Sequence, residues 1–202
     1  MRFGVLGTGT VGRTLAGKLA ELGHEVRIGS RTAGEDAVEF AEAAAFGEVV
    51  VNATAGGASV DALRSAGTEN LAGKLLIDVA NPLDSSQGMP PVLAFCNDDS
   101  LGERLQAEFP DARVVKTLNT VNAEVMVDPS LAGGDTDIFV SGNDADAKRQ
   151  VTELLGDFGW SRVLDLGDIT SARGPEMYLA LWLRLWQTTG TGHLNVKVVT
   201  GG

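Results

Sequence analysis

Apolar and polar positions along the chain alternate between two periods, which predicts alternating strands and helices. Short apolar runs predict buried strands at residues 2–7, 24–29, 48–54, 74–82, 112–120, 136–142 and 161–167. Apolar residues at helical spacing predict helices at residues 10–22, 35–46, 59–66, 99–109 and 144–159. In the first helix, Val11, Leu15, Leu19 and Leu22 fall on one face, and Gly23 ends the helix.

Strands that are continuous apolar runs and that alternate with helices are typical of a parallel sheet covered on both faces. We therefore expect an α/β protein with a Rossmann-like, doubly wound and mainly parallel sheet. A length of 202 residues fits a single domain. We expect the dinucleotide-binding part to occupy residues 1–167, and a short C-terminal extension of helix and strand, residues 168–202, to pack on the same domain.

The segment EMYLALWLRLWQTTG, residues 176–190, predicts a helix that is apolar around nearly its whole circumference. Its apolar residues are Met177, Leu179, Ala180, Leu181, Trp182, Leu183, Leu185 and Trp186. Such a helix must be covered on more than one side. Packing within the monomer and contact with a second subunit both meet that need, and the second would give a symmetric homodimer through this helix.

Composition excludes several functional classes. A net charge of −11 argues against nucleic-acid binding, which needs a basic surface. The lone Cys96 excludes an internal disulfide framework and suits a reducing cytoplasm, where we expect the protein to be. The late apolar stretch is too short to span a bilayer and carries Arg184, so no membrane association is expected. With two distant histidines and one cysteine, no metal site is expected.

Ligands of such sheets bind at the carboxyl ends of the strands. After the first predicted strand the chain reads GTGTVG, residues 7–12, a G-x-G-x-x-G pattern between a strand and an amphipathic helix. Gly7 would permit the tight turn, Gly9 would let the backbone approach a pyrophosphate, and Gly12 would let the helix pack closely. The helix N-terminus would then face the anion.

The residues that end the second strand indicate which dinucleotide is bound. An acid is expected there for the ribose 2′-hydroxyl of NAD, but the chain has Ser30, Arg31 and Thr32. Hydroxyl donors and a guanidinium suit the oxygens of a 2′-phosphate. This position therefore predicts NADP(H).

The chain resembles the family of coenzyme F420-dependent NADP oxidoreductases, in the short form of actinobacterial-type sequences. The resemblance covers nearly the whole chain and rests on GVLGTGTVGRTLAGKLAELGHEV, GSR, VVNATAG, DVANPLD, ARVVKTLNT, VSGNDADAK and LGDITSARGPEMYLALWLRLW. It implies an NADPH-binding Rossmann domain, usually homodimeric, that transfers hydride directly between nicotinamide and deazaflavin. Such chemistry depends on alignment more than on acids or bases, which agrees with the small polar residues that follow the strands.

The resemblance also implies roles for individual residues. The dinucleotide turn matches Gly7, Thr8, Gly9, Thr10, Val11 and Gly12. Asn52, Ala53 and Thr54 would line the cofactor, and Ala80, Asn81 and Pro82 would flank the nicotinamide. On the acceptor side, the candidates are Asn81, Asn119, Ser171 and Arg173.

We therefore expect an enzyme that transfers hydride between NADPH and coenzyme F420 or a flavin-like acceptor. The alternative is a sensor that binds NADPH without turnover. Two other residues leave two interpretations each. Lys116 either pairs with Asp78 or another carboxylate or contacts the cofactor, and His193 is either structural or faces the acceptor.

Overall fold

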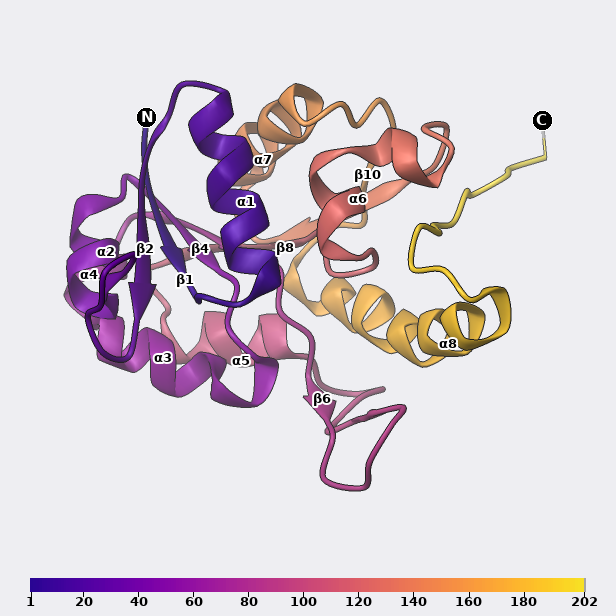
Figure 1. Cartoon of the computed structure of the whole chain (residues 1–202), viewed down its shortest axis with the longest axis horizontal. Coiled ribbons are helices and arrows are strands. Elements are labelled where there is room, and N and C mark those ends of the chain that lie inside the picture. The colour runs from indigo at the N-terminus through magenta and orange to yellow at the C-terminus, as the bar shows by residue number, and fades with distance from the viewer. Residues whose placement is uncertain (202) are drawn as a thin grey trace.

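A central β-sheet lies between two layers of helices in the computed structural model, which describes residues 1–201 (Figure 1). The strands lie in the order β10-β9-β8-β5-β4-β1-β2-β3. Their bounds are β1 Arg2–Leu6, β2 Glu25–Ser30, β3 Val38–Glu39, β4 Val49–Asn52, β5 Leu75–Asp78, β8 Arg113–Thr117, β9 Ile138–Gly142 and β10 Val163–Asp165. A separate hairpin, β6 Leu83–Asp84 and β7 Val92–Leu93, follows β5. The predicted Rossmann-like, mainly parallel fold is confirmed.

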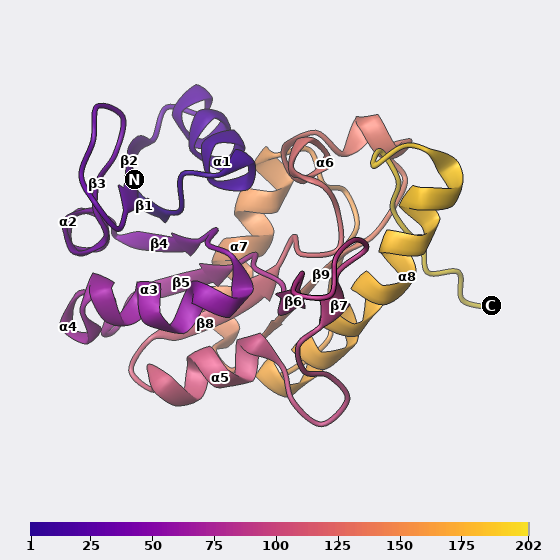
Figure 2. The same ribbon diagram turned by 60° about the horizontal axis from the view of Figure 1, so that its bottom comes forward.

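The helices cover the two faces of the sheet (Figure 2). One face packs against α1, α6 and α7, and the other against α2, α3 and α5. The helix bounds are α1 Thr10–Glu21, α2 Phe40–Phe46, α3 Ser59–Ala66, α4 Thr68–Leu71, α5 Leu101–Glu108, α6 Ala123–Val127, α7 Ala145–Asp157 and α8 Arg173–Thr189, with 3₁₀ turns at Gly56–Ala58, Pro129–Ala132 and Ile169–Ala172. The sequence pattern had not predicted α4, α6 or the β6–β7 hairpin, because such short elements have too few residues to show a period.

Helix α1 shows how the pattern positions the turn after β1. This turn lies at the carboxyl ends of the parallel strands, an edge of the sheet that is called the rim below. Leu15 and Leu19 are almost fully buried against β1 and its neighbours, which stabilises this packing by about 1.5–3 kcal/mol for each side chain. Leu22, which was predicted on the same helical face, follows the last helical residue and is 37% exposed. Gly23 then adopts a φ of 82°, as a helix-ending glycine does.

Two strands run against the rest of the sheet. β9 pairs antiparallel with β8, with Lys116 opposite Ser141, and β10 is parallel to β9. The chain leaves β8 at the carboxyl end of the sheet, passes through α6, and enters β9 from the same end. The sheet is therefore mainly parallel, as expected, and the sequence pattern did not indicate which strands run the other way, since an apolar run does not reveal the direction of its strand.

The predicted helix at residues 35–46 is shorter than its sequence pattern suggested. Helix α2 begins only at Phe40, and Val38 and Glu39 form β3, which extends the sheet beside Gly29 and Ser30. A turn in which the Gly34 N–H donates to the Ala37 carbonyl precedes β3. Pairing with the edge of β2 thus prevails over the helical pattern of this segment.

The C-terminal extension contains a helix but no strand within residues 168–201. Helix α8 begins at Arg173 and lies across the end of the sheet, and the tail after it is irregular (Figures 1 and 2). The tail contacts the body through the Asp137 N–H, which donates to the Val196 carbonyl at 3.0 Å. The prediction of a strand in this extension is therefore wrong. No helix in residues 1–201 has the length and apolar character needed to cross a membrane.

Candidate functional site

The first rim turn has the geometry expected of a dinucleotide-binding turn. Gly7 has a φ of +126°, and a Cβ on it would lie 2.5 Å from the Ala53 carbonyl oxygen. A Cβ on Gly12 would lie 2.0 Å from the Gly7 oxygen, so only glycine allows α1 to pack this closely. A Cβ on Gly9 would meet nothing within 4 Å. Gly9 therefore borders open space into which a ligand can approach.

The N-terminus of α1 opens onto this space. No side chain caps it, and its first turn contains no acidic residue. Its unpaired N–H groups and the positive end of its dipole therefore favour an anion. Thr10 begins the helix and is exposed, and Val11 follows it.

A hollow of about 550 Å³ extends from this turn toward β2. It is lined by Gly7, Thr8, Gly9, Ser30, Arg31, Thr32, Phe40, Ala53, Thr54, Ala55, Ala58, Asp61, Ala62 and Ser65. The Ser30 hydroxyl donates to the Thr32 carbonyl, which curls the loop after β2. Arg31 is exposed and has no ion-pair partner among residues 1–201, so its guanidinium is available at the edge of this hollow.

A second hollow of about 370 Å³ adjoins the first and shares Ala53, Thr54 and Ala55 with it. It is lined by Val11, Ala53, Thr54, Ala55, Gly56, Val79, Ala80, Asn81, Leu83, Ser85, Asn119, Val121, Asn122, Ala123, Met126, Leu179 and Trp182. None of its lining side chains within residues 1–201 is ionisable. General acid–base catalysis by a side chain therefore has no candidate in this hollow, whereas binding of an uncharged planar ring does.

Asn52 lies behind the shared wall and is fully buried. Its amide oxygen accepts from the Thr54 hydroxyl at 2.7 Å, and its amide nitrogen donates to Asp78 at 2.8 Å. Asn52 was expected to line the cofactor site, but it does not line either hollow. It instead holds the Thr54 side chain, which does.

Asn81 and Asn119 join two rim loops. The Asn81 amide donates to the Asn119 carbonyl at 2.8 Å, and the Asn119 amide donates to the Asn81 side-chain oxygen at 2.9 Å. A Cβ on Gly56 would lie 1.9 Å from the Asn81 carbonyl, so the loop after β4 packs directly on this pair. Ala80 lines the hollow with the pair, but Pro82 is buried beside it and does not.

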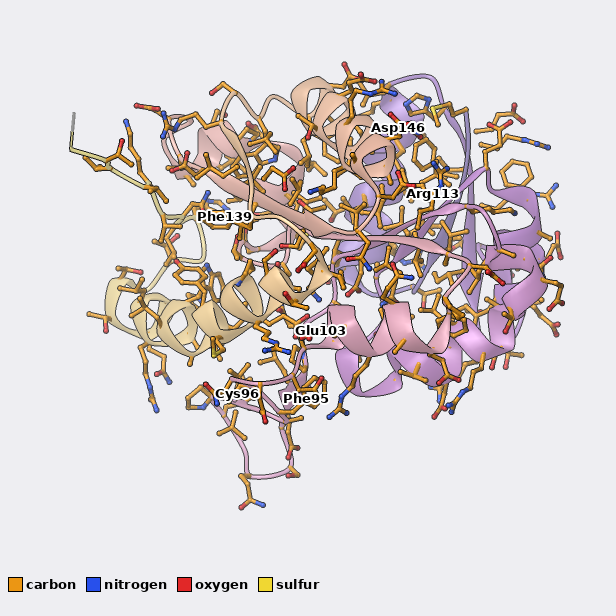
Figure 3. The ribbon with its side chains drawn as sticks, turned by 180° about the vertical axis from the view of Figure 1, so that it is seen from behind. Phe95, Cys96, Glu103, Arg113, Phe139 and Asp146 are labelled. Atoms are coloured by element: carbon orange, nitrogen blue, oxygen red, sulfur yellow. The ribbon has the colours of Figure 1, made fainter. Side chains whose placement is uncertain are left out.

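Two predicted acceptor-side residues lie elsewhere. The Ser171 hydroxyl donates to the Asp168 carbonyl and lies at hydrogen-bond distance, 2.8 Å, from the Ser141 hydroxyl. Arg173 makes two hydrogen bonds to Glu103 of α5, at 2.8 and 2.6 Å, and Figure 3 shows Glu103 on α5 beside the first turns of α8. Neither residue lines either hollow. Their role on the acceptor side stays a prediction, because the residues of α8 that line the second hollow are Leu179 and Trp182.

Leu179 and Trp182 were missed as wall residues. Their spacing of three places them on one helical face, but the sequence does not indicate that this face lies against the rim. Trp182 is 9% exposed, and its indole N–H has no acceptor in the described part of the chain. A buried donor without a partner suits a ligand that carries an acceptor atom.

The two open interpretations are resolved by contacts. Lys116 is fully buried and pairs with Asp78 and Glu176, each at 2.8 Å, so it is an ion-pair residue and not a cofactor contact. His193 pairs with the exposed Glu124 and lines neither hollow. No group of three or more potential metal ligands occurs within residues 1–201.

A larger hollow of about 710 Å³ lies on the outer side of α1 and β2. Several of its charged residues are already paired with one another, Arg13 with Asp36 at 3.6 Å and Arg27 with Glu42 at 2.9 Å. It includes neither the glycine turn nor the amide pair. We therefore place the functional site in the two connected hollows of the rim.

Comparison with known proteins gives the family. The profile described as "NADP oxidoreductase coenzyme F420-dependent" matches residues 2–82. Over 209 residues the chain is 31% identical to the F420-dependent NADP reductase of Methanothermobacter marburgensis, which covers 92% of this chain and 92% of the relative. The chain belongs to this family.

This family member also has a close structural counterpart. A crystal structure from Arthrobacter sp. FB24, provisionally named an F420-dependent NADP reductase, is 54% identical with a TM-score of 0.95, over 99% of this chain and 100% of the other. The rat metalloreductase STEAP3 is 29% identical over 194 residues, but the match covers 92% of this chain and only 38% of STEAP3. The chain thus spans well under half of that relative, and the resemblance stated from the motifs is confirmed at the level of the family.

Proposed function

We propose that this family member is an enzyme that binds NADP(H) along the rim and transfers hydride between it and a deazaflavin of the coenzyme F420 type. The observation that carries the proposal is the pair of connected hollows. Within residues 1–201, one presents an arginine without an ion-pair partner and a helix N-terminus without a side-chain cap, and the other has no ionisable side chain. The first suits a charged nucleotide and the second suits two neutral rings.

The residues present fit an NADP(H) molecule. Gly9 leaves room for the pyrophosphate, and the first N–H groups of α1 would bind it. Ser30, Arg31 and Thr32 would hold the 2′-phosphate at the other end. The nicotinamide would then lie past Thr54, against Ala80 and the Asn81–Asn119 pair. Names of the relatives agree with this cofactor.

The bound cofactors would supply the chemistry: the C4–H bond of NADPH breaks, the hydride forms a bond to C5 of the deazaflavin, and a solvent proton balances the charge. The chain's own residues position and shield the rings. Leu83, Met126, Leu179 and Trp182 give the second hollow apolar walls that exclude water. Alignment of this kind is the main requirement of hydride transfer.

The test is anaerobic mixing of the protein with NADPH and, separately, F420, FMN and FAD. We expect loss of the NADPH absorbance with F420. Tight NADPH binding without oxidation by any of the three would overturn the proposed activity and favour an NADPH-binding sensor.

We also propose that the chain forms a homodimer through α8. Met177, Leu181 and Trp186 are 38, 54 and 41% exposed on this helix, although they are large and apolar. Burial against a second copy would remove this surface from water, and a two-fold interface lets the same helix serve both subunits.

A further inference from the structure

A fully buried cluster of charged residues lies just beneath the rim, outside the two hollows. Lys116 of β8 is surrounded by Asp78 of β5 and Glu176 of α8. The side chains of Lys116 and Asp78 are 0% exposed and that of Glu176 is 3% exposed. Burying charged groups costs free energy unless each is paired, so a structural or functional role is expected for this cluster.

Every polar group of the cluster has a partner. The Lys116 ammonium has three protons and donates to Asp78, Glu176 and the Ala80 carbonyl, at 2.8, 2.8 and 2.5 Å. Glu176 also accepts from the N–H groups of Leu101 and Gly102 at the start of α5, at 2.7 and 3.0 Å. These two donors and the positive end of the α5 dipole offset the second negative charge.

Electrostatics support this account of the cluster. Burial by itself lowers the pKa of the Lys116 ammonium, but the carboxylates of Asp78 and Glu176 together outweigh burial and hold that pKa above its ordinary value. Lys116 is therefore charged at neutral pH. A charged ammonium with three fixed acceptors holds its neighbours in one arrangement.

The cluster holds Ala80 by both of its backbone polar groups. The Ala80 carbonyl accepts from Lys116, and the Ala80 N–H donates to the other oxygen of Asp78 at 3.2 Å. That same oxygen accepts from Asn52, which in turn holds Thr54. Ala80 and Thr54 both line the second hollow, so the cluster sets one wall of it from behind.

The cluster also holds a second part of the lining, which comes from α8. Glu176 lies about one turn before Leu179 and two turns before Trp182 on α8, and these two apolar residues line the second hollow together with Ala80. Lys116 therefore connects the wall formed by the loop after β5 with the wall formed by α8.

We propose that Lys116 is a positioning residue for hydride transfer. Its ammonium holds Ala80, in the loop after β5, at a fixed distance from Leu179 and Trp182 of α8, so that the two reacting rings lie at the distance and orientation that hydride transfer needs. The inference rests on the proposed function for its kinetic consequence. Its structural consequence, a loop after β5 that is ordered by Lys116, stands apart from any turnover.

The test compares Lys116→Met, the charge-balanced double variant Lys116→Met/Glu176→Gln, and the control Lys148→Met. Lys148 also binds one carboxylate and one carbonyl, Asp165 and Gly167, at 2.8 and 2.9 Å, but lies beside β10 away from the rim. We expect kcat for F420 reduction to fall about a hundredfold in both Lys116 variants, since misplacement by about 1 Å can cost that much. The NADPH dissociation constant should stay near that of the unmodified protein, because the phosphate contacts are remote.

Two further readouts separate positioning from general destabilisation. NADPH deuterated at the transferred position should give a larger isotope effect in the Lys116 variants, since hydride transfer becomes slower than the other steps. In the protein without ligand, backbone hydrogen exchange at residues 79–83 should rise in the Lys116 variants. Lys148→Met should change neither the isotope effect nor this exchange rate.

Unchanged exchange at Val79–Leu83 would overturn the inference whatever the turnover. Equal losses of kcat and NADPH affinity in the Lys116 and Lys148 variants would overturn it as well, as would an unchanged kcat. An unmodified protein that fails to reduce F420 would instead overturn the proposed function, and the exchange measurement would still decide the role of Lys116. The double variant keeps the test usable if the single variant does not fold.

Discussion

At the end of β2, a single guanidinium is expected to decide the choice of nucleotide. Arg31 lines the first hollow and is unpaired within residues 1–201. A charge-assisted hydrogen bond contributes about 1.5–3 kcal/mol, so Arg31→Ala should weaken NADPH binding by roughly ten- to a hundredfold. NADH binding should hardly change. Calorimetric titration with both nucleotides measures this.

The matched control for that prediction is Arg27→Ala. Arg27 is an exposed arginine of β2, the strand that Arg31 follows, and it pairs with Glu42 at 2.9 Å and lines the outer hollow instead. Its removal should leave both affinities unchanged. Equal affinity of the unmodified protein for NADPH and NADH would contradict the assigned role of Arg31.

Gly9 is the second residue whose replacement has a clear expected result. Its φ of −72° is open to any residue, and a Cβ there meets no protein atom. Gly9→Val should therefore fold normally while its branched side chain occupies the pyrophosphate position and abolishes NADPH binding. Circular dichroism, thermal melting and NADPH titration test this together.

Gly17→Ala serves as the comparison, because Gly17 lies in α1, the helix that Gly9 precedes, is exposed, and also has open space at its Cβ. Alanine in a helix interior is favoured over glycine by roughly 0.5–1 kcal/mol, so this variant should melt slightly higher and bind NADPH as before. NADPH binding by Gly9→Val that matches the unmodified protein would place the pyrophosphate elsewhere.

Between elements, α5 and α8 are joined by Glu103 and Arg173. The hydrogen bonds from Arg173 hold the pKa of the Glu103 carboxyl below its ordinary value, against the opposing effect of partial burial, and Ser100 adds to the lowering. A depressed pKa stabilises the fold above the unfolded-state value of about 4.3, and this contribution is lost as the pH falls through the folded-state pKa. Glu103→Gln should therefore lower the melting temperature at pH 7, and the difference should shrink below about pH 4.3.

Glu153→Gln provides the reference for that measurement. Glu153 pairs with Arg149 within α7, and both side chains are more than half exposed, at 65 and 60%. Exposed pairs contribute little, so its melting curve should follow that of the unmodified protein at all pH values. A pH-independent difference for Glu103→Gln would show that Arg173 does not act through the charge of Glu103.

At the scale of the whole molecule, we expect a second copy of the chain to cover the exposed apolar side chains of α8. If a second copy does, Leu181→Glu places a charge in the interface and should convert a dimer into a monomer, as measured by analytical ultracentrifugation. Leu131→Glu alters another exposed leucine, 41% exposed in the 3₁₀ turn Pro129–Ala132, and should leave the assembly unchanged. A monomeric unmodified protein would end the dimer proposal.

Much of the fold could be predicted because most strands and helices depend on residues that are close together in the sequence. The periods of the apolar residues gave most of the strands and long helices, and α3 matches its predicted bounds of residues 59–66. The dinucleotide turn was predictable for the same reason, since Gly7, Gly9 and Gly12 act within six residues of one another. Short elements such as α6 and β3 escaped because they have too few residues to show a period.

The sequence by itself thus determined the family, the alternation of strands and helices, and the nucleotide end of the rim, because each of these depends on residues close together in the chain. Only the tertiary structure decided the partners of Lys116, the position of Ser171 and Arg173 outside the two hollows, and the position of Leu179 and Trp182 in the lining of the second. These depend on where α8 crosses the sheet. The contacts of α8 include the buried pair of Lys116 and Glu176, residues 60 positions apart, which no local pattern encodes.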